Sequence, residues 1–492
     1  IHVTVALKLR NPDQLHAYNA KPHQPMSKAQ LAANHLPTQA QAQAVANFLK
    51  NAGFSNVRIS ANRMLVNADG NAATAARAFD TSLAQVRTHD GRVTFANTSD
   101  IRIPASLRDS VQAVLGLQGV HKAQTFAVGV QAGANASLTG HNPLEFAEIY
   151  GTSGLNPATS VDTAVFGWGD MSLTLTDLAT FTSDNGLDPV NTHVVCVDYG
   201  GYNSGVINTT DPTCANFDEG TVEWDIDSQD IIGTSGGVKS LTFYSAYGGY
   251  NGSVTNALNA IVNPPAGIPL AAVVNQSFGE CERFEDSGQG GDGSAQADDA
   301  LYAIGVAQGQ TFSASTGDSG ADECGDGGKN SASYPASSPY NVAVAGTTLA
   351  TLNGTYVRET EWTGSGGSPS SFEMSPSWQS PLTYGTYKGF RGPDVAFDAN
   401  PNTGALVITY GSTSQWGGTS LASPIFVGAW ARLIANGAVD PMTPAGQQLY
   451  SFPASYIHDV RAGNNHGYIA KRGWDWASGR GSIDFSHFSP GN

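Results

Sequence analysis

One stretch of the chain is suited to nucleophilic catalysis, Gly417-Gly418-Thr419-Ser420-Leu421-Ala422-Ser423-Pro424. The two glycines allow a tight turn, and the apolar run IFVGAWARLIANG that follows predicts a buried helix. Ser420 would then lie at a helix N-terminus, where backbone amides and the helix dipole stabilise developing negative charge. Ser420 is therefore a candidate nucleophile, and a helix-capping serine is the alternative interpretation.

A serine nucleophile needs a base, and no histidine stands in a suitable setting. Seven of the eleven histidines fall in or beside a basic N-terminal part, His193 lies in a strand-like run, and three are near the C-terminus. The remaining candidates for the base are carboxylates in a helix-like segment from Glu219 to Gln229. At i,i+4 spacing Glu223 and Asp227 share one helix face and can share a proton, whereas Asp225 points elsewhere. A solvated acidic helix start is the alternative.

A third carboxylate, Asp318, lies in the turn STGDSG directly after the strand-like run TFSAS. The C-terminal end of a strand is where open α/β sheets place functional groups. An aspartate that only forms a turn is the alternative interpretation.

Charge divides the chain of 492 residues into two units. Residues 1–140 hold thirteen Lys and Arg against six Asp and no Glu, a net charge of +7, and the remainder carries −24. Only 13% of all residues are charged, and the total of −17 argues against nucleic acid as a partner. No apolar run reaches the roughly 18 residues of a membrane span, so we expect no membrane partner either.

Hydrophobic patterning predicts a different fold for each unit. The N-terminal unit reads as α+β, with strands near residues 3–10, 57–60 and 64–68 and helices over 27–52 and 72–79. The charge-free segment 125–140 suits an exposed, cleavable linker. Beyond it, short apolar runs alternate with helix-like stretches, which indicates an α/β fold with a mostly parallel sheet covered on both faces. These runs are residues 163–168, 193–199, 240–246, 271–277, 311–316, 341–346 and 405–410.

Taken together, the three motifs resemble the sedolisin family, the serine-carboxyl peptidases, and the resemblance covers essentially the whole chain. EWDIDSQ, GGTSLASPIFVG, and the GECE and DECGD contexts of two cysteines place it nearest the bacterial members. The resemblance implies a subtilisin-like fold in which Ser420 is the nucleophile, Glu223 the general base, Asp227 its partner and Asp318 the side chain of the oxyanion hole. It also implies an activation propeptide over residues 1–122, a cleavable linker over 123–141 and a catalytic domain over 142–492.

The four cysteines lack the CxxC spacing of zinc or redox sites, which favours two disulfides and an oxidising compartment over free thiols. The family resemblance implies that Cys281 pairs with Cys324, which leaves Cys196 with Cys214. We therefore expect a secreted, extracellular protein.

A cluster of oxygen donors near the C-terminus matches the family's calcium site. The resemblance implies one structural Ca²⁺, held by the side chains of Asp459 and Asp475 and the carbonyls of Val460, Lys471 and Gly473. Such hard oxygen ligands are those that calcium prefers. Lys471 stands where the family usually has glycine, and its charge beside the cation would weaken the site. A loop without metal is the alternative.

The residues and the family resemblance together imply an acid-active serine endopeptidase, in proenzyme form, that acts as a monomer on proteins and peptides. An ordinary glutamate has a pKa of about 4.3, so it is best matched to acid conditions, and Asp318 must be protonated to donate a hydrogen bond. The propeptide would inhibit within the same molecule, and cleavage would fall between about Lys122 and His141. A tripeptidyl exopeptidase and an inactive binding protein on the same scaffold are the alternatives.

Overall fold

The computed structural model describes residues 1–130, 138–198, 201, 204–214 and 220–490. Its N-terminal unit has a four-stranded antiparallel sheet of order β2-β3-β1-β6, and α3 packs on β2 and β3 above a core of its own that includes Val5, Leu49 and Val66. The elements are β1 His2–Leu7, α1 Pro12–Asn19, α2 Lys28–Asn34, α3 Gln39–Ala52, β2 Ser55–Ile59, β3 Leu65–Asp69, α4 Ala72–Ala78, β4 Leu83–Arg87, β5 Val93–Asn97 and β6 Val111–Leu115.

The single helix expected over residues 27–52 is wrong, because the chain forms two helices there, α2 and α3. Pro37 lies between them and cannot continue a helix. Each helix then begins at a capping box, with Ser27 and Thr38 as the N-caps and a glutamine three residues further on. Local sequence therefore overrides the helical periodicity at this point.

The second unit is built on a nine-stranded sheet of order β11-β10-β12-β9-β13-β15-β17-β18, with β19 paired to β17. Strands β10, β12, β9, β13, β15, β17 and β19 run parallel, while β11 and β18 are antiparallel at the edges. The strands are β9 Ala158–Trp168, β10 Thr192–Val197, β11 Ile207–Asn208, β12 Val238–Ala246, β13 Val273–Gln276, β15 Thr311–Ser315, β17 Asn341–Leu352, β18 Thr355–Glu361 and β19 Val395–Asp398. The mostly parallel sheet is thus confirmed.

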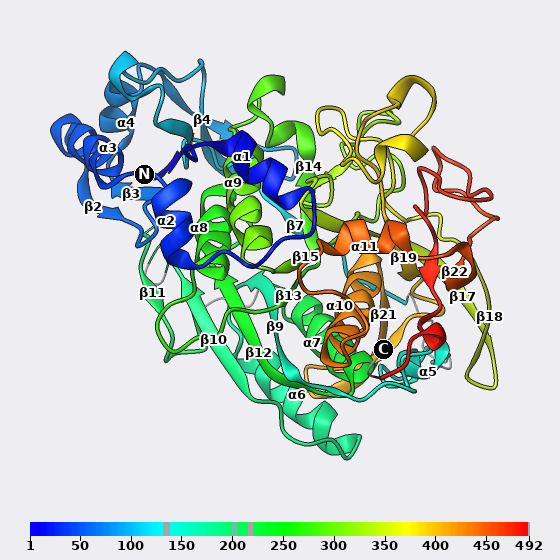
Figure 1. Ribbon diagram of the computed structural model, residues 1–492. Helices are drawn as coiled ribbons and strands as arrows, with labels where there is room; N and C mark the ends of the chain where they lie inside the picture. The colour runs from blue at the N-terminus through cyan, green and yellow to red at the C-terminus, as the bar shows by residue number, and fades with distance from the viewer. Residues whose placement is uncertain (131–137, 199–200, 202–203, 215–219, 491–492) are drawn as a thin grey trace.

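Helices cover both faces of this sheet, with α8 and α9 on one side and α10 and α7 on the other (Figure 1). The helices are α5 Glu145–Ile149, α6 Ser172–Asp184, α7 Thr221–Ser235, α8 Asn251–Val262, α9 Ser294–Ala307, α10 Thr419–Ala435 and α11 Ala445–Ser451. Smaller sheets contain β14 Phe278–Cys281, β16 Ser333–Tyr334, β20 Ala405–Thr409, β21 Ser412–Gly417, β22 Ile457–His458 and β23 Ser482–Ile483. The run 405–410, expected in the main sheet, is β20, which pairs with β21 outside it.

Helix α10 is buried from Thr419 to Leu433, as its apolar sequence predicts. It packs against α7 and beneath strands β9, β13, β15, β17 and β19, so the residues at its N-terminus are fixed by the centre of the fold. In the described part of the chain, no helix is both long and apolar enough to cross a membrane.

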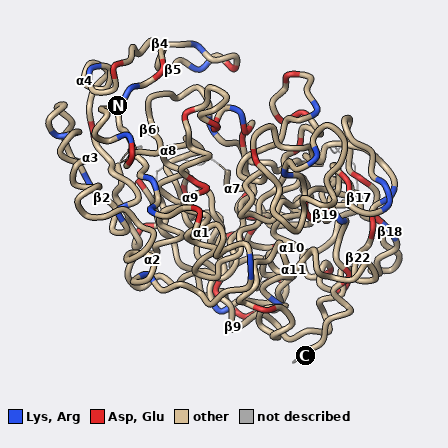
Figure 2. The backbone as a smooth tube through the Cα atoms, turned by 45° about the horizontal axis from the view of Figure 1, so that its top comes forward, with Lys and Arg blue, Asp and Glu red and all other residues tan. Residues whose placement is uncertain are grey.

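The N-terminal unit sits on α8 and α9 of the second unit (Figure 1). Asn62 Nδ2 donates to Asn259 Oδ1 at 2.7 Å, Asn256 Nδ2 donates to Thr4 Oγ1 at 3.1 Å, and Asn19 Nδ2 donates to the carbonyl of Ala303 at 2.8 Å. Lys and Arg recur along the N-terminal unit in Figure 2. These three contacts nevertheless join neutral groups. The attraction between the oppositely charged units therefore adds to an interface that amide hydrogen bonds already hold together.

Candidate active site

Helix α7 carries Glu223 and Asp227 into the interior, where both residues are buried. Every residue from Glu223 to Ser235 is buried, so the solvated acidic helix start is wrong; Glu219 lies outside the described residues. Burial raises the pKa of Glu223 well above its usual range, and the nearby Asp227 carboxylate raises it further. Burial likewise raises the pKa of Asp227. Two buried carboxyls that repel each other retain a proton between them.

A chain of hydrogen bonds fixes Asp227. Its Oδ1 accepts from the Ser277 hydroxyl at 2.5 Å, Ser277 Oγ accepts from Asn275 Nδ2 at 2.9 Å, and Asn275 Oδ1 accepts from Ser423 Oγ at 2.7 Å. Asp227 Oδ2 is buried without a hydrogen-bond partner. The sequence analysis missed Ser277 and Asn275. Their signal was three polar residues, NQS, at the C-terminal end of a buried parallel strand.

Ser420 is the second residue of α10 and is buried. Its Oγ lies 3.4 Å from the carbonyl oxygen of Ser277. Its hydroxyl lies close enough to Glu223 to lower the pKa of that carboxyl, although the two groups do not align as a hydrogen bond. The structure thus brings together Ser420 and Glu223, which are far apart in sequence. No contact recorded among the described residues joins Ser420 to a histidine.

Asp318 follows β15 and faces the start of α10. Its Oδ1 accepts from the backbone amide of Thr419 at 2.8 Å and from the Thr419 hydroxyl at 2.9 Å. Its Oδ2 is buried without a partner. Burial raises the pKa of Asp318 to about 7, against the lowering effect of the Thr419 hydrogen bonds. Asp318 is therefore a neutral acid below about pH 7, with one oxygen available to donate a proton.

The segment expected to be an exposed linker instead lies across these residues. Strand β7, Gln124–Thr125, pairs antiparallel with β14, and strand β8, Val128–Gly129, pairs antiparallel with β21. The backbone amides and carbonyls of the segment form hydrogen bonds to these strands, whereas in an exposed linker they would bond to water. Residues 131–137 of the predicted linker lie outside the described residues. From His141 the chain joins the second unit, where its amide donates to Gly404 O at 2.8 Å.

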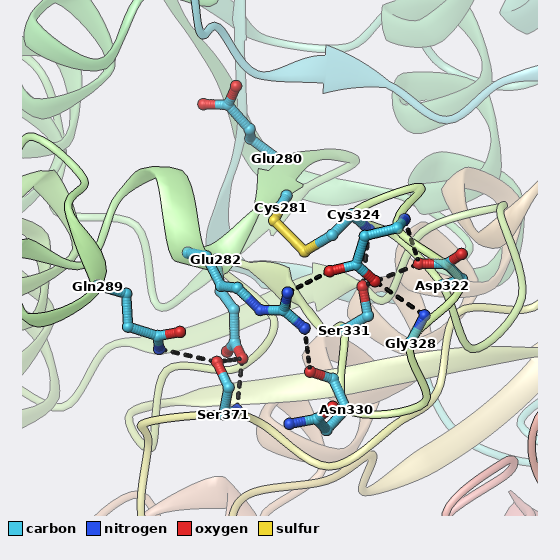
Figure 3. Close-up of a disulfide and its surroundings, with 12 residues drawn as sticks. Glu280, Cys281, Glu282, Gln289, Asp322, Cys324, Gly328, Asn330, Ser331 and Ser371 are labelled. Carbon is cyan, nitrogen blue, oxygen red and sulfur yellow. Dashed lines mark hydrogen bonds and ion pairs between the residues drawn. A yellow bond between two sulfur atoms is a disulfide. The ribbon is translucent and has the colours of Figure 1, made fainter.

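Both predicted disulfides are present, Cys196 with Cys214 and Cys281 with Cys324. The second joins β14 to the loop that follows Asp318, so it ties one wall of the site to another (Figure 3). In that loop, Ser331 Oγ donates to Asp322 Oδ1 at 3.2 Å.

The predicted calcium ligands come from two neighbouring segments. The amide of Gly473 donates to Asp459 Oδ1 at 3.0 Å, and the amide of Lys471 donates to Asp475 Oδ2 at 2.8 Å. The described residues contain no cluster of three or more His, Cys, Asp or Glu side chains suited to a metal, so carbonyls would have to complete this site. The ammonium of Lys471 lies 3.4 Å from the centre of the Tyr384 ring, where a cation–π contact holds it. Asp459 Oδ2 also accepts from Arg461 Nε at 2.7 Å, so a cation at this place would have to displace the guanidinium.

Comparison with known proteins agrees with this geometry. A sequence model of the Pro-kumamolisin activation domain matches residues 1–120, and one of the subtilase family matches residues 215–451. Sedolisin of Pseudomonas sp. (strain 101) is 39% identical over 99% of this chain and 86% of its own length. The chain belongs to the sedolisin family of serine-carboxyl peptidases.

Two further comparisons support this family and its fold. Xanthomonalisin of Xanthomonas sp. (strain T-22) is 39% identical over 98% of this chain, which spans 64% of that relative. The structure of Pseudomonas sedolisin complexed with pseudo-iodotyrostatin superposes with a TM-score of 0.63 at 40% identity. It covers 71% of this chain and 96% of its own. The subtilisin-like fold with a preceding activation domain is thereby confirmed.

Proposed function

We propose that this protein is an acid-active serine-carboxyl endopeptidase in latent form, with Ser420 as nucleophile, Glu223 as general base, Asp227 as its partner and Asp318 as oxyanion donor. One observation carries the proposal. Three buried carboxyls, two on α7 and one that follows β15, lie around a serine at a helix N-terminus, and among the described residues no contact joins that serine to a histidine. Burial of these carboxyls beside a serine shifts their protonation, as acid–base catalysis at that serine requires.

The buried residues divide the chemistry of peptide hydrolysis among them. Glu223 takes the proton of the Ser420 hydroxyl as it attacks the peptide carbonyl, and then gives it to the departing amine. Ser277 fixes Asp227, which holds the proton that the two carboxyls retain between them and orients Glu223. Asp318 donates from Oδ2 to the oxyanion while Thr419 holds Oδ1. Water then hydrolyses the acyl-enzyme by the same proton transfers in reverse order.

An acidic working range follows from the proton positions. Asp318 donates only while protonated, and with a pKa of about 7 it loses this capacity as the pH rises past neutrality. Glu223 acts as a base only while the Glu223–Asp227 pair carries a negative charge, which sets a lower limit. Activity should therefore rise and fall over an acid range whose upper limit lies near neutrality.

The endopeptidase form of the proposal rests on the bound segment. Strands β7 and β8 lie on opposite sides of Ser420, and the chain continues from both of them. At the N-terminal side, the amide of Ala123 donates to Gly249 O at 2.7 Å, so the cleft admits a chain beyond the length of a tripeptide. A tripeptidyl exopeptidase must instead recognise a free amine. Hydrolysis of an amine-blocked peptide at least as fast as its free counterpart would favour the endopeptidase.

Covalent labelling tests the active site itself. After incubation at pH 4, a fluorophosphonate probe should label the parent chain at Ser420, and Ser420→Ala should remove both labelling and peptide hydrolysis. A chain that takes no label and hydrolyses no peptide between pH 3 and pH 7 would be the inactive binding protein instead.

Two further properties belong to this proposal. One Ca²⁺ would be held by Asp459 and Asp475 with the carbonyls of Val460, Lys471 and Gly473, and it would join two C-terminal segments without taking part in catalysis. The two disulfides suit an oxidising environment, which supports secretion to the cell exterior. We propose that the protein acts there as a monomer.

A further inference from the structure

Only two residues of the bound segment separate its strand pairs. Thr125 lies opposite Phe278 of β14, and Val128 lies opposite Gly417 of β21. Phe126 and Ala127 therefore cross the site at the turn between β21 and α10, immediately before Ser420. Pairing on both sides fixes the backbone register of this dipeptide, because a shift by one residue would lose the hydrogen bonds of both strand pairs.

The peptide group between these two residues lies between the proposed oxyanion donor and the proposed base. A Cβ atom built on Gly418, whose φ is 97°, would lie 1.8 Å from the carbonyl oxygen of Phe126 and 2.6 Å from Asp318 Oδ2. The carbonyl oxygen and the proposed oxyanion donor thus lie close together. On the other side, the backbone amide of Ala127 lowers the pKa of Glu223, which places it beside the proposed base. The Phe126 oxygen thus lies on the side of Asp318 and the Ala127 nitrogen on the side of Glu223, and cleavage requires a small movement that turns these contacts into hydrogen bonds.

We propose that Phe126–Ala127 is the peptide bond that this enzyme cleaves in itself, and that the Phe126 ring beside Gly279 fixes the position of this cut. The inference rests on the proposed function. Ser420 Oγ bonds to the Phe126 carbonyl carbon and gives its proton to Glu223. The C–N bond breaks as that proton passes to the Ala127 nitrogen. Water then supplies hydroxyl to the Phe126 carbonyl and a proton to Ser420, leaving a carboxyl group on Phe126 and an amine on Ala127.

The pocket for the ring depends on Gly279. A Cβ atom there would lie 3.2 Å from Cε2 of Phe126, 2.7 Å from the carbonyl oxygen of Tyr334 and 2.1 Å from Ser333 Oγ. Any larger residue at this position would take space from the ring. Strands β14 and β16 bound the pocket and pair with each other, and the Cys281–Cys324 disulfide lies at the end of β14. A wall held in place by strand pairing and a disulfide selects by shape.

The cleavage site is tested by sequencing the first product. The purified chain is brought to pH 4, and the N-terminus of the large fragment is determined over time at several protein concentrations. We expect Ala127 to appear first, with a rate constant independent of concentration, followed by trimming towards His141. Phe126→Gly should slow this cut roughly tenfold to a hundredfold, while Phe126→Tyr, the matched control, should retain it.

Peptides test the pocket independently of propeptide folding. Activated enzyme should cleave a quenched Gln-Thr-Phe-Ala-Val peptide roughly tenfold or more faster than the version with Gly or Asp in place of Phe. Gly279→Val should reduce that preference. A first N-terminus elsewhere, or no preference for Phe, would overturn this inference while leaving the peptidase proposal intact. Failure to cleave every peptide and to label Ser420 would instead remove the proposed function.

A separate observation concerns Glu323, which is not among the family residues named above. Its Oε1 accepts from the amide of Ser319 at 2.8 Å. A Cβ atom on Gly317 would lie 2.2 Å from its carboxyl carbon, so the carboxyl rests on the residues that flank Asp318 on both sides. The next residue, Cys324, is bonded to Cys281 and anchors the loop (Figure 3). The geometry points to Glu323 as a positioning residue that fixes the turn carrying Asp318.

Two substitutions of Glu323 test this role. The carboxylates that face Asp318 are Glu223 and Glu323, and Asp322 faces Glu323 in turn. Glu323→Gln keeps a side-chain oxygen that can accept from Ser319, and burial raises the pKa of Glu323 well above its usual range, so the Gln variant should keep kcat within about twofold of the parent at pH 4 and leave the upper pH limit of kcat/KM unchanged. Glu323→Ala should lower kcat roughly tenfold with little change in KM. Equal kcat and pH profiles for parent and Glu323→Ala, or a Gln variant as impaired as the Ala variant, would overturn the assignment.

Discussion

The neutral state of Asp318 makes a quantitative prediction about stability. Asp318→Asn keeps an Oδ1 acceptor for Thr419 and places an N–H where the carboxyl has its proton, but it cannot ionise. Burial raises the pKa of Asp318 from 3.8 to about 7. At about 1.4 kcal/mol per pKa unit, the shift corresponds to about 4 kcal/mol of unfolding free energy.

The sign follows from where the proton is bound. Below pH 3.8 the carboxyl is protonated in both the folded and the unfolded chain, so the stabilising contribution is fully present. Between pH 3.8 and about 7 the unfolded chain loses this proton and the folded chain retains it, so the stability of the parent falls as pH rises. Above about pH 7 the loss is complete. The Asn variant should therefore gain up to about 4 kcal/mol relative to the parent between pH 4 and pH 7.5.

Urea unfolding followed by tryptophan fluorescence measures this difference. Both chains should carry Ser420→Ala, so that neither cuts itself, and Asp13→Asn on the exposed surface serves as the control for net charge. We expect the free energy of unfolding of the Asp318→Asn chain to approach or exceed that of the parent at pH 7.5 and to lose this advantage at pH 4. A difference between the two chains that is the same at both pH values would refute the neutral, buried state of Asp318.

Three further outcomes are expected. Glu223→Gln should lower kcat/KM at pH 4 roughly a hundredfold to ten-thousandfold because it removes the base, while Asp225→Asn on the same helix should retain most activity. Quenched-peptide kinetics with active-site titration would measure both, and full activity in the Gln variant would contradict the assignment of Glu223 as the base. A chelator should lower the melting temperature, excess Ca²⁺ should restore it, and Asp475→Asn should abolish this response. A melting temperature that the chelator does not change, with no bound metal detected, argues against the calcium site. The intact chain should be inactive at pH 7 and lose its propeptide at pH 4, because protonation of the acidic unit weakens its attraction for the basic one. Mass spectrometry of the parent and of a Ser420→Ala control measures the loss of the propeptide, and equal loss from the control would show that another protease is responsible.

The sequence alone determined which residue types could act and where they stand in the chain. The glycine turn before an apolar helix predicted the position of Ser420, and i,i+4 spacing placed Glu223 and Asp227 on one helix face. The strand patterns predicted the parallel sheet, and the turn after TFSAS predicted that Asp318 lies at its carboxyl edge. These inferences succeeded because helix and strand periodicity, and the tight turns of glycine, are local properties of the chain.

Tertiary structure alone decided what surrounds these residues. Whether Asp318 is charged depends on burial by segments that are distant in sequence, such as Thr419, 101 residues away. The support of Asp227 by Ser277 and Asn275 likewise depends on the approach of β13 to α7. A charge-free segment reads as a flexible linker, yet residues 124–125 and 128–129 are bound strands, because their hydrogen-bond partners lie on β14 and β21. Such long-range pairing carries no local signature in the sequence, since any extended backbone can supply the amides and carbonyls that it needs.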